Sequence, residues 1–146
     1  MNYERFNYER KGLFLKGLLH IFLPLLLGSL LYFFFGKKGT LLTNTISFFT
    51  ENENILAIKE SLQTNFSPPN FLIYQLPDAL WAYAFCASIL FIWQGQKAAL
   101  VSFVAFVLCF LYEIMQYMKW TAGTFDWWDV MVMGVACWCA FYFNQK

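Results

Sequence analysis

Long apolar runs alternate with short polar segments along the chain, and this pattern predicts four membrane-spanning helices. The runs cover residues about 13–35, 76–93, 98–118 and 127–143. At about 1.5 Å of rise per residue, the first run spans roughly 34 Å, more than a hydrocarbon core about 30 Å thick. We therefore predict an all-α membrane protein in which residues 1–146 form a single domain, a bundle of four transmembrane helices.

The longest polar segment, residues about 37–70, separates the first two runs. It carries apolar side chains in pairs at helical spacing, and these are Leu41, Leu42, Ile46, Phe49, Ile55, Leu56, Ile58 and Leu62. Such spacing predicts one or two short amphipathic helices that lie on the bilayer surface or cap the bundle. The prolines of "SPPN" at 67–70 then predict an extended turn before the second span.

Proline, glycine and polar turn residues indicate where the spans begin and bend. Pro77 suits the first position of the second helix, and Asp78 in the first turn would complement the helix dipole. The polar turn "QGQK" at 94–97 makes the second and third spans antiparallel neighbours. Within the first span Pro24 predicts a kink, and Gly28 gives a small face for close helix contact.

Basic residues precede the first apolar run, as they do in a secretory signal peptide. The run is longer than the about 7 to 15 residues of a signal-peptide core, and "FFFGKKGT" offers no small-residue cleavage site. We therefore predict a retained helix, preceded by an interfacial segment at residues 1–11. His20 in this helix predicts a hydrogen bond to a neighbouring helix.

The composition supports the membrane class and excludes several others. Hydrophobic residues make up 60% of the chain and charged residues 13%, whereas an average soluble protein carries about 25% charged residues. The net charge of +1 leaves no basic surface for nucleic acid. All four cysteines lie inside apolar runs, where they predict small buried side chains rather than disulfides or metal ligands. The sequence indicates no metal and no cofactor.

The basic residues also favour one orientation in the membrane. With the N-terminus in the cytoplasm, the basic residues on the inside are Arg5, Arg10, Lys11, Lys16, Lys97 and Lys146. Those on the outside are Lys37, Lys38, Lys59 and Lys119. The positive-inside rule therefore favours a cytoplasmic N-terminus. This topology brings four acidic residues to the outer membrane face, namely Asp78, Glu113, Asp126 and Asp129.

Glu113 has the least routine position of these acids. It lies about one and a half turns inside the end of the third span. A carboxylate at that depth is costly unless it is paired, solvated or protonated, so a functional role is the default hypothesis. Gln116 shares its helix face and could bond the same group. The structural alternative is a helix-end acid that ties the third span to a neighbouring helix.

Asp126 and Asp129 have a structural interpretation beside the functional one. An Asp that opens a helix, with an acidic residue three positions later, is the N-capping pattern. Asp78 could likewise serve only the helix dipole. Both interpretations stay open for each of these acids.

Tryptophans gather at the same boundary, and they are Trp81, Trp120, Trp127 and Trp128. They indicate an aromatic belt at the headgroups or, alternatively, a stacking platform for a sugar or a cationic ligand. The candidate ligand-binding residues are therefore Glu113, Gln116, Asp126, Asp129, Asp78 and Trp120.

The order of Glu113 and Gln116, a Gly-containing loop, "FDWWD" and a last apolar span resembles the VanZ-like family of small bacterial multi-pass membrane proteins. In that family the third span ends in Glu-x-x-Gln, and a loop resembling Gly-Arg-x-Asp-x-x-Asp leads into the final helix. The resemblance covers about residues 71–143 at motif level; Thr124 stands where the family often has Arg, and Met133 where it has Asn. It implies a four- or five-helix protein of the bacterial inner membrane. Some members are linked to glycopeptide antibiotic resistance, and no catalysis is established for the family.

Two functions fit these features. The first is a VanZ-like cell-envelope protein that binds a lipid or cell-wall headgroup at an acidic, aromatic-rimmed site on the outer face, with the carboxylates lining a shared cavity. The alternative is a non-catalytic accessory or structural subunit of a larger membrane protein complex. An intramembrane enzyme with Glu113 as base would need a nucleophile or metal that the sequence does not indicate, and proton transport would need a continuous polar file. The sequence therefore favours a non-catalytic protein whose partners are membrane lipids or such a complex.

Overall fold

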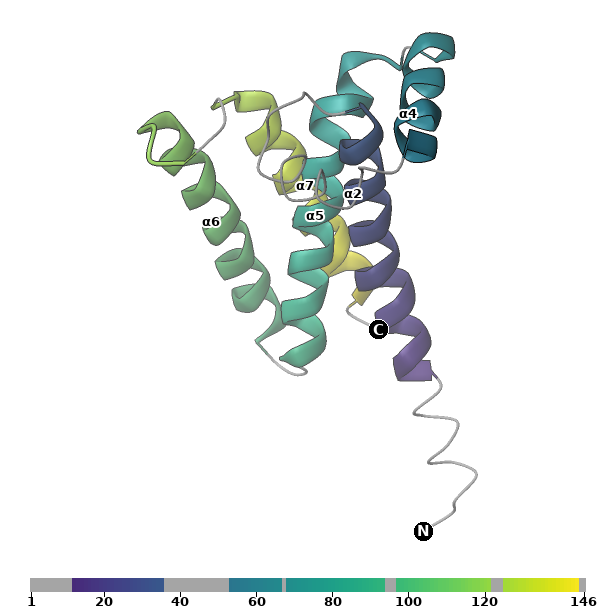
Figure 1. Ribbon diagram of the computed structural model, residues 1–146. Helices are drawn as coiled ribbons and strands as arrows, with labels where there is room; N and C mark the ends of the chain where they lie inside the picture. Colours follow the sequence, from purple (N-terminus) through teal and green to yellow (C-terminus); the bar gives the residue numbers. More distant parts are fainter. Residues whose placement is uncertain (1–11, 36–52, 67, 94–96, 122–124, 145–146) are drawn as a thin grey trace.

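The computed structural model describes residues 12–35, 53–66, 68–93, 97–121 and 125–144, and every regular element in them is helical (Figure 1). The elements are η1 (Leu18–Phe22), α2 (Leu23–Phe35), α4 (Glu53–Asn65), α5 (Asn70–Ile92), α6 (Ala98–Tyr117) and α7 (Trp127–Asn144). The predicted all-α class is therefore confirmed for the part of the chain that the structure describes.

Three of the described helices are long and apolar enough to cross a membrane: Gly12–Phe35, Asn70–Ile92 and Ala98–Tyr117. They indicate a membrane protein. The predicted count of four spans is not confirmed, because α7 is long enough but not among the helices that are apolar enough. Its 18 residues include Trp127 and Trp128, Asp129 and Asn144, which lower its mean hydropathy.

The first span contains a wider helical turn directly before its proline. The π-helix η1 ends at Phe22, and Pro24 follows two residues later. Pro24 has no N–H to donate to the carbonyl of His20, and a π turn is one recognised way for a helix to rearrange such a ladder. His20 lies on this turn, and its Nδ1 is 2.6 Å from the hydroxyl of Tyr83 on α5. The predicted bond between helices is therefore confirmed.

The second span begins earlier than Pro77 predicts. Pro69 is extended, with φ −60° and ψ 149°, and α5 starts at Asn70, so the prediction of a start near residue 76 is wrong. Pro77 lies inside the helix rather than at its first position, and Asp78 is not a first-turn acid. Pro77 is fully buried against neighbouring helices, and such packing is how membrane helices tolerate a missing backbone bond.

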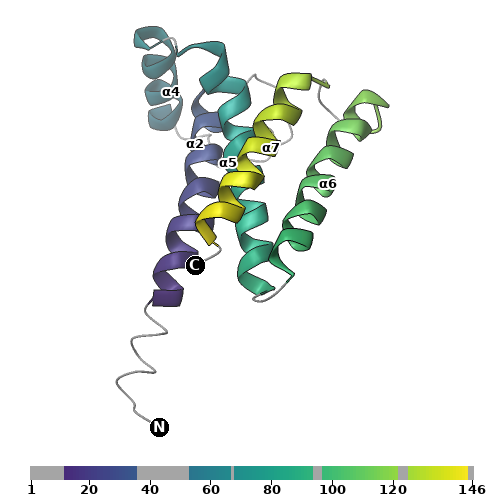
Figure 2. The same ribbon diagram turned by 180° about the vertical axis from the view of Figure 1, so that it is seen from behind.

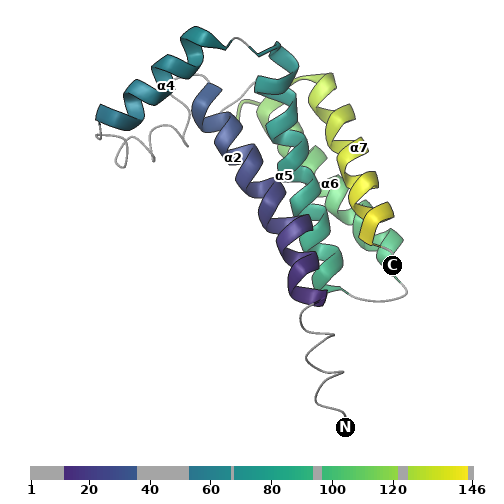
Figure 3. The same cartoon turned by 90° about the vertical axis from the view of Figure 1, so that its right-hand side faces the viewer.

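Helix α5 lies at the centre of the bundle (Figures 2 and 3). It packs against η1 and α2 on one side and against α6 and α7 on the other, and α6 also contacts α7. Successive helices α5 and α6 run antiparallel, as the short connection predicts, although residues 94–96 of that turn lie outside the described residues. Every side of the bundle is therefore built onto one helix.

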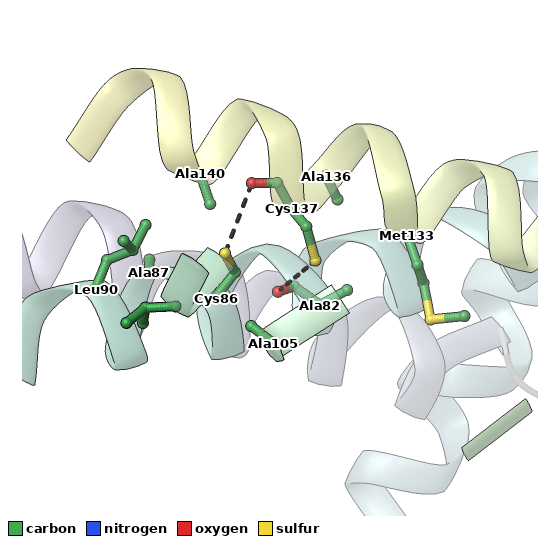
Figure 4. Close-up of a cluster of buried hydrophobic side chains, with 10 residues drawn as sticks. Ala82, Cys86, Ala87, Leu90, Ala105, Met133, Ala136, Cys137 and Ala140 are labelled. Atoms are coloured by element: carbon green, nitrogen blue, oxygen red, sulfur yellow. Dashed lines mark hydrogen bonds between the residues drawn. The ribbon is translucent and has the colours of Figure 1, made fainter. Parts of the chain in front are cut away.

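Small side chains fill the contact between α5 and α7 (Figure 4). The buried residues are Ala82, Cys86, Ala87 and Leu90 of α5, Val101 and Ala105 of α6, and Met133, Ala136, Cys137 and Ala140 of α7. Alanine and cysteine let two helix backbones approach closely. Such close packing drives helix association in a membrane, because apolar side chains there are already surrounded by apolar lipid.

Two cysteines hold this contact in a reciprocal arrangement. Cys86 Sγ donates to the carbonyl oxygen of Cys137 at 3.6 Å, and Cys137 Sγ donates to the carbonyl oxygen of Ala82 at 3.9 Å (Figure 4). Both cysteines are buried and free. Thiols are weak donors, so these contacts orient the helices more than they stabilise them. The prediction of small buried cysteines is confirmed for this pair.

Helix α4 lies beside the end of α2, where the predicted cap of the bundle falls (Figure 3). Gln63 Nε2 donates to the carbonyl oxygen of Phe34 at 2.7 Å, and Lys59 Nζ lies 5.2 Å from the centre of the Phe33 ring. One helix of the first polar segment is thus confirmed. The expected helix around residues 41–49, the interfacial segment 1–11 and most of the basic residues used for orientation lie outside the described residues.

Helices α2 and α5 approach each other closely at Gly28. A Cβ atom at this position would lie 2.8 Å from Trp81 Nε1 and 3.2 Å from the carbonyl oxygen of Pro77. Real Cβ atoms do not tolerate contacts this short, so only glycine fits without a shift of one helix. The predicted small face at Gly28 is therefore confirmed.

We expect Gly28→Ala to destabilise the protein by about 1–3 kcal/mol, because the methyl group must displace Trp81 or the backbone at Pro77. The measurement is thermal unfolding in mild detergent, followed by tryptophan fluorescence. Gly17→Ala is the matched control, since its Cβ would meet only Phe91 Cζ at 3.9 Å. Equal melting temperatures for the two variants would contradict the prediction.

Candidate functional site

A cavity of about 630 Å³ lies where α5 and α7 begin and α6 ends. In Figure 1, α6 diverges from the other helices, and its separation from them increases toward this end of the bundle. The charged and amide side chains that line the cavity are Gln75, Asp78, Glu113, Gln116, Asp126 and Asp129. Of the four carboxylates, Asp78 lies on α5, Glu113 on α6 and Asp129 on α7. Asp126 directly precedes α7.

The cavity brings together five of the six residues that the sequence nominates. They are Asp78 of α5, Glu113 and Gln116 of α6, Asp126 just before α7, and Asp129 in its first turn. Trp120 is the exception, because its side chain is 69% exposed and does not line the cavity. The binding role of all six residues stays a prediction.

Glu113 is the one buried charged residue among the described side chains, with 3% of its surface exposed. Among the described residues, its Oε2 atom has no hydrogen-bond partner. Its nearest charged neighbours, Asp129, Asp78 and Asp126, are all acids and repel a negative charge at this position. A buried carboxylate oxygen without a donor is costly. A backbone hydrogen bond from Asp126 to the Glu113 carboxyl group ties α6 to the start of α7, as the structural alternative predicts, but it leaves Oε2 unexplained.

Asp126 caps α7, as the structural interpretation predicts. The backbone N–H of Trp128 donates to Asp126 Oδ1 at 3.0 Å, which satisfies one of the free donors of the first turn. Asp129 lies in that first turn, but its buried Oδ1 atom has no hydrogen-bond partner in the part of the chain that the structure describes. The cap therefore explains Asp126 and leaves one oxygen of Asp129 unexplained.

The end of α6 is shaped by one residue in the left-handed region. Lys119 has φ 59°, and its N–H donates to the carbonyl oxygen of Gln116 at 2.9 Å. The N–H of Trp120 donates to the carbonyl oxygen of Met115 at 2.9 Å. This pair of bonds is the Schellman motif, in which glycine usually takes the position of Lys119. The motif stops the helix just beyond Gln116.

Aromatic side chains form the rest of the rim, and they are Tyr32, Tyr74, Trp81, Phe85 and Tyr112. The rings of Tyr32 and Trp81 lie 5.5 Å apart at a tilt of 46°. Trp81 also fills the space beside Gly28, so the α2–α5 contact holds one wall of the cavity in place. Trp127 and Trp128 are exposed, as an aromatic belt at the headgroups would require.

Several lining residues are absent from the set that the sequence nominates. Gln75 and Phe85 lie at helical spacing on the same face of α5 as Asp78, a signal that is visible once the helix begins at Asn70. Tyr112 precedes Glu113 and lines the same cavity. Tyr32 comes from α2, and no local pattern links that helix to the acids.

The lining favours a ligand that donates hydrogen bonds or carries positive charge. Four carboxylates line the cavity, and none of the described lining side chains is basic. Within the described ranges, no three histidine, cysteine or acidic side chains are placed to hold a metal ion. The volume falls within the range of about 300–1,000 Å³ that is typical of small-molecule sites.

Comparisons with models of protein families, with curated proteins and with solved structures found no match to this chain. The VanZ-like resemblance therefore rests on the motif residues of the chain itself.

We expect Lys119→Gly to stabilise the protein by about 0.5–1 kcal/mol, because glycine adopts a positive φ without steric cost. Thermal unfolding in detergent measures the gain. Lys97→Gly removes the same charge at a residue with φ −104°, so it should not share the gain. A similar change in both variants would show that the charge, and not φ, is responsible.

We expect Asp126→Ala to destabilise the protein by about 1 kcal/mol through loss of the cap, whereas Asp126→Asn, an equally good cap, should leave stability unchanged. Thermal unfolding of the two variants separates them. If Asn were as destabilising as Ala, the negative charge rather than the hydrogen bond to Trp128 would be the stabilising feature.

Proposed function

We propose that this chain is a VanZ-like integral membrane protein of the bacterial cell envelope that binds a lipid or cell-wall headgroup in the acidic cavity. In this proposal the N-terminus is cytoplasmic, α7 is a fourth span, and the cavity opens at the outer face of the inner membrane. The protein acts by binding, and no catalytic step is part of the proposal.

The observation that carries the proposal is the unpartnered oxygen of Glu113. Buried polar atoms in proteins almost always have a hydrogen-bond partner, and an exception asks for an explanation. Glu113 Oε2 is buried in a membrane-compatible helix and belongs to a residue that lines a cavity large enough for a headgroup. A ligand that donates a hydrogen bond there would remove the cost of burying the carboxylate.

The position of α7 supports its role as a fourth span. Its 18 residues measure about 27 Å at about 1.5 Å per residue, close to the thickness of a hydrocarbon core. Its buried residues Met133 and Ala140 belong to the same core as Ala82 and Leu90 of α5, so the two helices pack over much of their lengths. A helix packed in this way against a spanning helix shares its depth.

The location of the cavity supports recognition at the membrane surface. It lies at the bundle end where α4 stands and where three helix termini meet (Figure 1). Trp127 and Trp128 are exposed at that end, where indole rings favour the headgroup layer. A headgroup in this layer would face the carboxylates, with tyrosine and tryptophan rings beside it.

We expect Glu113→Gln to reduce ligand retention roughly tenfold or more, since a hydrogen bond to a charged group contributes about 1.5–3 kcal/mol. The variant keeps the shape of the side chain and removes its charge. The measurement is native mass spectrometry of purified protein after incubation with polar lipids extracted from bacterial membranes.

Glu60→Gln is the matched control, because Glu60 is exposed on α4 and does not line the cavity. Thermal unfolding of each variant shows that the fold is intact. Equal retention of the same molecules by the wild type and by both variants would overturn the proposal.

A further inference from the structure

We propose that the ligand of the acidic cavity is a membrane lipid whose headgroup carries a primary ammonium group. The ammonium would lie among the carboxylates, and the apolar part of the lipid would lie against the deeper wall. This inference rests on the function proposed above and specifies its ligand class. Charge, donor chemistry, depth and access each support it independently.

The charge of the lining selects a cation. Asp78, Glu113, Asp126 and Asp129 line one cavity, and no basic side chain among the described residues joins them there. Like charges at short range disfavour one another, and an anionic headgroup would add to that repulsion. A cation removes it, and the aromatic residues Trp81 and Tyr32, which also line the cavity, could add attraction through their ring electrons.

The unpartnered oxygens select a cation with hydrogens to donate. Glu113 Oε2 and Asp129 Oδ1 are both buried without a hydrogen-bond partner among the described residues, and only 3% of the Glu113 surface is exposed. A primary ammonium group has three N–H donors and could serve both oxygens. A quaternary ammonium group has none, so it would satisfy the charge but leave the oxygens without partners.

The polarity of the cavity wall changes with depth, and this change favours an amphiphilic ligand. Along α5 the lining changes from Asp78 to Ala82 and then to Phe85, which lies about 10 Å deeper at about 1.5 Å per residue. Along α6 it changes from Glu113 to the apolar Leu108. The cavity is thus acidic near the bundle end and apolar below it. A small soluble amine would leave the apolar part of the wall uncovered.

The exposed faces of the wall provide an entry from the side. Phe85, Leu108 and Tyr112 line the cavity, and 41%, 46% and 50% of their respective surfaces are exposed. Such exposure of lining side chains indicates that the cavity is open at these residues, which belong to the apolar helices α5 and α6. A lipid could therefore enter from the bilayer without first passing through water.

The test is competition among lipids with identical acyl chains. Protein in mild detergent is incubated with equal amounts of phosphatidylethanolamine, phosphatidylcholine and phosphatidylglycerol, and the retained lipids are counted by native mass spectrometry. We expect phosphatidylethanolamine to exceed phosphatidylglycerol roughly tenfold and phosphatidylcholine by a smaller factor, because only the primary ammonium both neutralises and donates. Glu113→Gln should abolish this preference, and Glu60→Gln should keep it.

A second arm separates a lipid from a soluble source of the same chemistry. Glycerophosphoethanolamine carries the same headgroup without acyl chains, and we expect it not to displace the bound lipid. Displacement at equal concentration would overturn the role of the apolar wall. If retention depends on Glu113 but shows no preference for the primary amine, the ligand class is wrong while the proposed function stands. If no lipid depends on Glu113, the proposed function fails as well.

Discussion

The close packing of α5 against α7 sets the positions of the other elements. Small residues line this contact on both helices, and Cys86 and Cys137 exchange thiol contacts with backbone carbonyls across it. In a bilayer, where apolar side chains gain little from mutual burial, close backbone approach is the main source of stability. The same contact brings the start of α7, with Asp126 and Asp129, beside Asp78, so the helix packing also assembles the acids.

The acidic cavity lowers the stability of the folded protein, whereas the helix packing below the cavity raises it. A protein selected only for stability would gain from a hydrophobic residue at position 113, since an unpaired buried charge contributes nothing to folding. Instead, the chain holds Glu113 with an unpartnered oxygen and ends α6 with a non-glycine residue in the left-handed region. Features of this kind concentrate where a protein binds or reacts.

The helical class, the approximate spans and the gathering of acids at one end follow from hydrophobic periodicity and from counting helix ends. The start of α5 does not follow, because Pro77 is a strong local signal for a first turn, and burial among neighbouring helices overrides that signal. This error hid the role of Gln75 in the lining. Tyr32 is hidden for another reason, since its place beside Trp81 depends on the contact at Gly28, which links residues distant in sequence.

The two contacts between the first span and α5 have a mechanical consequence. His20 meets Tyr83 at one height and Gly28 meets Trp81 at another, so the first span can neither slide along α5 nor rotate against it without losing one of them. The residues that α6 contributes to the hydrophobic core, Val101 and Ala105, both lie in its first half. Any widening of the cavity would therefore be a tilt of α6 about that half, with the wall formed by α2 and α5 held still.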